Sequence, residues 1–105
     1  MVKRGKKRYL AIVSEPMQHP SEMMKALISS YQELFGKLGL ASAGLKFIKG
    51  YGDGVMIVKC ALESLSKTLL AAASIRELEG NKVAFRVVAV SGTIRGLVRK
   101  ISSLD

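Results

Sequence analysis

Four stretches of the chain are rich in β-branched and aromatic residues, and each is short enough for a single strand. They are "YLAIVS" (9–14), "LKFIKG" (45–50), "VMIVKC" (55–60) and "KVAFRVVAV" (82–90). The second and third stretches are separated by "YGDG" (51–54), which predicts a hairpin turn because Asp-Gly tolerates positive φ angles. The pattern therefore predicts four strands, two of them joined by a tight turn.

Helical spacing of apolar residues appears in the segments between and after these strands. The first segment begins after Ser21, a candidate N-cap, and is expected to end at Gly39. A second helix is expected to open at Ser64 and to end at Gly80-Asn81. The last is expected over 93–103, with an apolar stripe made by Ile94, Leu97, Val98 and Ile101.

The resulting order is strand, helix, two strands, helix, strand and a terminal helix. It predicts an α+β fold, a ferredoxin-like βαββαβ sandwich with a four-stranded antiparallel sheet and an extra C-terminal helix. Residues 9–105 form a single domain in this interpretation, and residues 1–8 form a basic flexible tail. The first and third strands carry the fewest charges, as expected of the two central strands.

Both faces of the predicted sheet are apolar, although a sheet covered on one side usually alternates apolar and polar residues. The terminal helix, at about 1.5 Å per residue, is too short to shield a whole four-stranded sheet. A protein partner or a second copy of the chain is the expected cover. The residues assigned to this partner interface are Met56, Val58, Val88 and Val90.

The charge of the chain points to a polyanionic partner. Lys and Arg number 17 against 8 Asp and Glu, a net charge of +9 over 105 residues. Nucleic acid is the first candidate, and an acidic membrane surface or a ribosomal RNA scaffold is an alternative. The tail contributes Lys3, Arg4, Lys6, Lys7 and Arg8.

The number of cysteines and the pattern at the N-terminus indicate in which cellular compartment the protein is expected. A single cysteine, Cys60, rules out an internal disulfide framework. The basic start runs into only a short apolar stretch, so neither a signal peptide nor a membrane span is expected. We expect a soluble, cytoplasmic protein.

Catalytic constellations are hard to assemble from this sequence. The single histidine, His19, lies in a loop and far from Cys60, which argues against a zinc site. The carboxylates are not clustered as a two-metal nuclease requires. The central strands offer one aromatic residue, Tyr9, so the sheet is not expected to stack RNA bases. We expect no catalytic residue, no metal site and binding through phosphates.

The stretch "VVAVSGTIRGLVRK" (87–100) joins a strand to a basic helix through a glycine turn. Two interpretations stay open. The helix N-terminus can hold phosphate on its free N–H groups, or a Ser or Thr hydroxyl can cap the same groups. The candidate RNA-binding residues here are Ser91, Gly92, Thr93, Arg95, Arg99 and Lys100.

Three pieces in this order, "LFGKLGLASAGLKFI", "VMIVKC" and "VSGTIRGLVRK", resemble the ribonuclease P protein component 2 family, the archaeal Pop-five-like proteins. The resemblance implies a ferredoxin-like fold and a non-catalytic RNA-binding subunit of a ribonucleoprotein endonuclease that removes the 5′ leader of precursor tRNA. It implies that the RNA subunit catalyses with magnesium, while the protein binds no cofactor. The implied partners are ribonuclease P RNA, precursor tRNA and protein component 3, with a possible homodimer within a heterotetramer.

Two other functions compete with this one. A ribosomal-type structural RNA-binding protein would share the charge but does not explain the set of matching pieces. A small phosphate-ester or acyl-phosphate hydrolase would need an arginine in a glycine-rich loop after the first strand, and "SEPMQHP" (14–20) supplies none.

Overall fold

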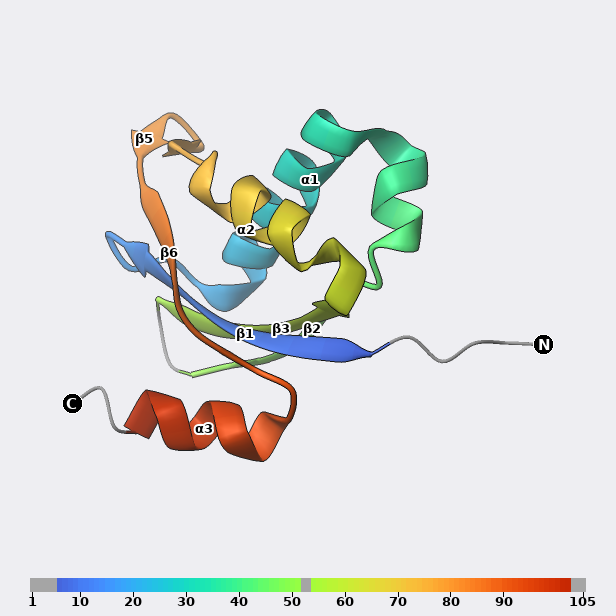
Figure 1. Cartoon of the computed structure of the whole chain (residues 1–105). Helices are drawn as coiled ribbons and strands as arrows, with labels where there is room; N and C mark the ends of the chain where they lie inside the picture. Colours follow the sequence, from blue (N-terminus) through green and yellow to red (C-terminus); the bar gives the residue numbers. More distant parts are fainter. Residues whose placement is uncertain (1–5, 52–53, 103–105) are drawn as a thin grey trace.

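A computed structural model describes residues 6–51 and 54–102 of the chain. Its centre is a four-stranded antiparallel sheet of β1 (Lys7–Glu15), β2 (Lys46–Gly50), β3 (Val55–Ala61) and β6 (Ala84–Ser91). Two helices, α1 (Pro20–Ser42) and α2 (Leu65–Ala73), lie on one face of the sheet (Figure 1). The third helix, α3 (Ile94–Ser102), lies on the opposite face. The molecule therefore has three layers.

The strand order is β2-β3-β1-β6, which places the first and third strands of the sheet at its centre. This is the ferredoxin-like order, and the predicted α+β class and βαββαβ arrangement are confirmed. The two central strands are also the ones whose side chains are most completely buried.

The main core lies between the sheet and the pair α1 and α2. The sheet contributes side chains from all three of its longer strands, and the helices contribute a stripe of large residues with helical spacing. Tyr31 of α1 is 1% exposed, and its ring packs against Phe35 with centroids 4.9 Å apart. The fully buried members from β1, β3 and α1 are Leu10, Ile12, Met23, Leu27, Met56, Val58 and Cys60.

A smaller core lies between the sheet and α3. Of the residues that the structure describes, only Ala11, Ile57 and Leu97 are fully buried there, and residues such as Tyr9 and Val88 are half-buried around them. The helix packs on β6 and β1, which leaves the β3 and β2 side of this face less covered. The terminal helix is therefore a cover for the second face, but a partial one.

The assignment of Met56 and Val58 to a partner interface is wrong, because both are fully buried in the main core under α1 and α2. Alternation along a strand separates two faces but does not say which face receives the larger helices.

A β-bulge in β6 also changes which residues of that strand share a face. Ile12 is paired with Val87 and Ala11 with Ala89, so Val88 is an extra residue on β6.

The bulge returns Val90 to the α1 and α2 face, where it packs against the main core. Val88 alone among the four assigned residues lies on the α3 face, half-buried against that smaller core. The predicted partner surface is thus distributed over both faces of the sheet.

The ends of the helices differ from those expected. The first helix continues past Gly39 to Ser42, and its break falls at Gly36, where φ is 76° and ψ is 173°. The second helix begins after the short 3₁₀ turn η1 (Leu62–Ser64) and already ends at Ala73. The following residues form a small hairpin of β4 (Glu77–Leu78) and β5 (Asn81–Lys82), because Glu79 and Gly80 both take positive φ.

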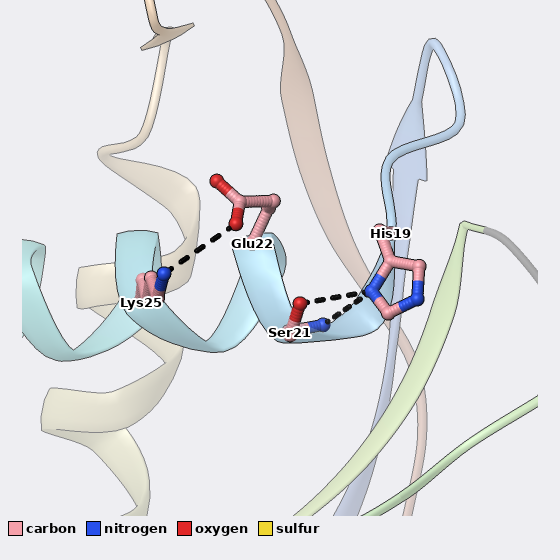
Figure 2. Close-up of polar contacts among 4 residues, drawn as sticks. All are labelled: His19, Ser21, Glu22 and Lys25. Atoms are coloured by element: carbon pink, nitrogen blue, oxygen red, sulfur yellow. Dashed lines mark hydrogen bonds and ion pairs between the residues drawn. The ribbon is translucent and has the colours of Figure 1, made fainter.

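The N-terminus of α1 is capped by His19 and not by Ser21. The His19 Nδ1 atom accepts a hydrogen bond from the Ser21 backbone N–H at 3.2 Å and lies 2.9 Å from the Ser21 hydroxyl (Figure 2). The exposed pair Glu22 and Lys25 follows in the first turns, 3.6 Å apart. The single histidine therefore has a local structural role.

Three expectations concern the ends of strands and the membrane. Lys7 and Arg8, which were assigned to the tail, are the first residues of β1. Residues 52–53 of the predicted turn at 51–54 lie outside the described residues. Gly54 is described and has a φ of 85°, and the Tyr51 N–H donates a hydrogen bond to the Val55 carbonyl at 2.9 Å. In the described part of the chain, no helix is long and apolar enough to cross a membrane.

Candidate nucleic-acid interface

The corner between β6 and α3 is held by two hydroxyl caps. The Thr93 Oγ1 atom accepts a hydrogen bond from the Gly96 N–H at 3.0 Å, and the Ser91 Oγ atom accepts one from the Thr93 N–H at 3.3 Å. The Thr93 carbonyl accepts from the Leu97 N–H at 3.0 Å, which makes Thr93 the N-cap residue. The capping interpretation therefore describes this helix start.

Gly96 permits this arrangement. A Cβ atom on Gly96 would lie 2.5 Å from the Ser91 Oγ atom and 2.9 Å from the Thr93 Oγ1 atom. These separations are shorter than real side chains tolerate, so both capping hydroxyls would have to move. A glycine inside this short helix costs helix propensity, and the close approach of the two caps accounts for its presence.

Arg95 and Arg99 are exposed and lie one helical turn apart on α3. The same helix is fixed to the sheet by the buried Leu97 and the half-buried Ile101. The two ion pairs found within the described residues, Lys25 with Glu22 and Arg86 with Glu15, involve neither arginine. The guanidinium groups are therefore held on a rigid support and turned to solvent.

Lys100 lies on the same helix but is engaged with the sheet. Its Nζ atom donates a hydrogen bond to the Val90 carbonyl at 2.6 Å. This contact ties the last turn of α3 to the end of β6. Among the predicted RNA-binding residues, Lys100 thus helps to position the helix that carries the arginines.

Arg8 joins the corner from β1. Its Nη1 atom donates to the Lys7 carbonyl at 2.8 Å and lies 3.5 Å from the point that a Cβ atom on Gly92 would occupy. The structure therefore brings Arg8 together with the Ser91–Thr93 turn. Lys6 is exposed beside it, while Lys3 and Arg4 lie outside the described residues.

Sequence reasoning missed a group of lysines on the α3 face of the sheet. Lys59 lies opposite Lys46 of β2 and opposite Tyr9 of β1. The pKa of Lys59 lies below its ordinary value of 10.5. The largest cause is the positive charge of Lys7, followed by desolvation and by the charge of Lys46. The available signal was a lysine inside the otherwise apolar stretch "VMIVKC".

A further basic side chain of β2 stacks on an aromatic ring. The Lys49 Nζ atom lies 4.7 Å from the centroid of the Tyr51 ring, in cation–π geometry. Tyr51 packs at the margin of the smaller core. The α3 side of the molecule thus presents basic groups from β1, β2, β3 and α3.

In the part of the structure that residues 6–51 and 54–102 cover, no three His, Cys, Asp or Glu side chains come together to hold a metal ion. Burial raises the pKa of the Cys60 thiol, while a hydrogen bond with Thr68 acts in the opposite direction. A buried thiol with a raised pKa is a poor nucleophile.

These features define a small basic α+β protein that displays fixed cationic side chains on one side of its sheet. The chain belongs to the Rpp14/Pop5 family, whose model matches residues 8–102.

Curated relatives support the same placement, and a solved structure shares the fold. The ribonuclease P protein component 2 of Pyrococcus furiosus is 31% identical, over 95% of this chain and 86% of its own length. The component 2 proteins of Thermococcus kodakarensis and Methanosarcina mazei are 34% and 28% identical, each over 92% of this chain and over 83% and 84% of their own lengths. A chain in the cryo-EM structure of yeast ribonuclease MRP shares the fold with a TM-score of 0.69 at 8% identity, covering 99% of this chain and 94% of that chain.

Proposed function

We propose that this chain is a non-catalytic, RNA-binding protein subunit of ribonuclease P. The observation that carries the proposal is the family match over residues 8–102, together with several archaeal relatives named ribonuclease P protein component 2. The net charge of +9 agrees with a subunit that neutralises phosphates. The protein is a component of a ribonucleoprotein that processes precursor tRNA.

The division of labour follows from what the side chains can do. Cationic groups on a rigid helix fix the register and orientation of RNA but cannot activate water for hydrolysis. In this proposal the RNA subunit performs the cleavage with magnesium, and the protein supplies phosphate contacts that stabilise the folded RNA. The ribosomal-type alternative explains the charge equally well but not the family match.

The RNA contact that we propose at the α3 corner uses side chains more than helix N–H groups. The Thr93 and Ser91 hydroxyls already accept the N–H groups of Gly96 and Thr93. Arg95 and Arg99 are exposed on the same helix, and Arg8 lies beside Gly92. Arginine binds phosphate through its planar set of N–H donors, so these three residues are the main contacts in the proposal.

A protein partner is also proposed, with ribonuclease P protein component 3 as the expected one and a homodimer within a heterotetramer as the expected assembly. Support comes from large apolar side chains that remain exposed, five of which are on α1 and α2 (Ile28, Leu34, Leu38, Leu69 and Leu70). Leu38 is 88% exposed and follows the break of α1 at Gly36. Exposed apolar groups gathered on one layer are typical of a protein-binding surface.

The proposal is tested by capture of the tagged protein from extract of its own cells, at its natural expression level. Sequencing of the captured RNA is expected to show strong enrichment of ribonuclease P RNA over ribosomal RNA, and mass spectrometry is expected to show component 3. The captured material is expected to cleave precursor tRNA at the 5′ leader in magnesium. Enrichment of ribosomal RNA and ribosomal proteins instead would support the ribosomal-type alternative and overturn the proposal.

A further inference from the structure

One row of residues crosses the whole sheet on the face that carries α3. Ser91 of β6 is paired with Tyr9 of β1, Tyr9 with Lys59 of β3, and Lys59 with Lys46 of β2. Residues paired across strands point to the same face. Neighbouring strands are about 4.8 Å apart, so the row spans roughly 14 Å from the α3 corner to the edge of the sheet.

Three lysines, from β2, β3 and β1, gather beside this row. Lys46 and Lys59 are directly opposite each other, and Lys7 lies two residues before Tyr9, on the same face of β1. Their proximity is reflected in the lowered pKa of Lys59, for which the Lys7 charge is the largest cause. Like charges directly opposite in a sheet destabilise it.

No acidic side chain forms an ion pair with these lysines within residues 6–51 and 54–102. Glu63 lines a hollow of about 240 Å³ at the end of β1 and β3, together with Lys6, Lys7 and Lys59. The hollow therefore has a surplus of positive charge even with Glu63 included.

A purely structural role explains only part of this arrangement. Lys46 is on the outermost strand, where a lysine protects an exposed sheet edge from pairing with other chains. Lys59 is on an inner strand with a partner on each side, so it has no edge to protect. Because α3 packs on β6 and β1, Lys46 and Lys59 lie on the two strands that this helix covers least.

We infer that Lys7, Lys46 and Lys59 form a second phosphate-binding site for RNA, separate from the α3 corner and joined to it by the cross-sheet row. A phosphate placed among the three ammonium groups would supply the negative charge that the protein does not. A single RNA strand could then run across the sheet, past the half-buried ring of Tyr9, from the lysines to Arg95. This inference rests on the proposed RNA-binding function and names where on the sheet a second contact lies.

The test compares Lys46→Gln/Lys59→Gln with the wild type in binding to transcribed ribonuclease P RNA over a series of salt concentrations. Loss of about two phosphate contacts is expected to lower the salt slope of log K by roughly two units. The matched control is Lys37→Gln/Lys82→Gln, which removes the same charge from exposed positions on α1 and β5. The control is expected to keep nearly the wild-type slope.

A second measurement separates binding from folding. The midpoint of urea unfolding for the Lys46/Lys59 variant is expected to stay equal or to rise, because a like-charge pair has been removed. A lower midpoint would contradict the repulsion on which the inference stands.

The outcomes distinguish this site from the proposed function. An unchanged slope in the Lys46/Lys59 variant, or an equal decrease in the control, would overturn the second site while leaving the proposed function in place. A wild-type protein that shows no measurable binding to ribonuclease P RNA at low salt, where phosphate contacts are strongest, would overturn the RNA-binding function itself.

Discussion

The two faces of the sheet are built from the same strands but differ in how they are closed. The face under α1 and α2 buries long side chains such as Leu10, Met56 and Tyr31 completely. Among the described residues, the face under α3 completely buries only Ala11, Ile57 and Leu97, and Lys46 and Lys59 lie on its β2 and β3 side. One face is closed by the protein itself, and the other is half closed and basic. The comparison indicates that an apolar strand pattern marks both faces for burial, while the length of the covering helix decides how much of each remains available for binding.

The largest expected effect separates the two cores. Met56→Ala should lower the free energy of unfolding by about 3 kcal/mol, because it removes a fully buried side chain from the large core. Leu97→Ala should cost about 2 kcal/mol and act locally, since the small core has few other buried residues. Urea unfolding gives the free energy of unfolding of each variant. Amide exchange shows whether α3 loses protection before the sheet does. Equal loss of protection in both layers after Leu97→Ala would mean that α3 is an integral part of one cooperative core.

The next largest effect is a change in RNA binding that leaves the stability of the fold almost unchanged. Arg95→Ala/Arg99→Ala should lower the salt slope of RNA binding by roughly two units, because two arginines held on a fixed helix are removed. The unfolding free energy should change by no more than about 0.5 kcal/mol, as is usual for exposed charges. The measurement is RNA affinity across a salt series, together with cleavage in the reconstituted enzyme.

The Lys37→Ala/Lys82→Ala variant, on the helical side of the molecule, is the control for net charge. If the arginine variant keeps its affinity and its slope, the corner is a helix cap with no role in RNA binding.

The smallest expected effect is a dependence on alkaline pH. The pKa of Lys59 is lowered in the folded protein, so the unfolded chain holds more protons than the folded one just below pH 10.5. Stability contributed by this group therefore rises as the pH passes through the lowered pKa toward 10.5. The difference between wild-type and Lys59→Gln unfolding curves, measured from pH 8 to 10.5, should show this rise. A flat difference over that range would mean that Lys59 does not interact with Lys7 and Lys46.

Most of the architecture followed from periodicity. The four main strands, the three helices and the central position of β1 and β3 were all predicted, because burial on a sheet and on a helix imposes periods of 2 and 3.6 residues. The ends of the helices were not, since Gly36 and Gly39 are equally good breaking residues in sequence. Which face receives the larger helices was also not predictable, because both faces are apolar, and this is why Met56 and Val58 were assigned to the wrong environment.

The site was predicted unevenly for a related reason. Ser91, Thr93, Arg95 and Arg99 are neighbours in sequence, so a local pattern was sufficient to group them. Lys7, Lys46 and Lys59 come from three strands, and only the register of the sheet places them together. In the sequence of a basic chain, the positions of the lysines do not indicate which of them the register places opposite each other.

The bulge at Val88 makes β6 tolerant of a change in length at that point. Because Val88 is an unpaired extra residue, its deletion would leave Val87 opposite Ile12 and Ala89 opposite Ala11. Every side chain from Ala89 to Ser91 would keep its face, and α3 would still start on the same side of the sheet. β1 has no extra unpaired residue, so a deletion within it would move every residue beyond the deletion to the opposite face of the sheet. Among related sequences, gains and losses of a single residue are therefore compatible with this fold at the bulge of the edge strand and not in the central strand beside it.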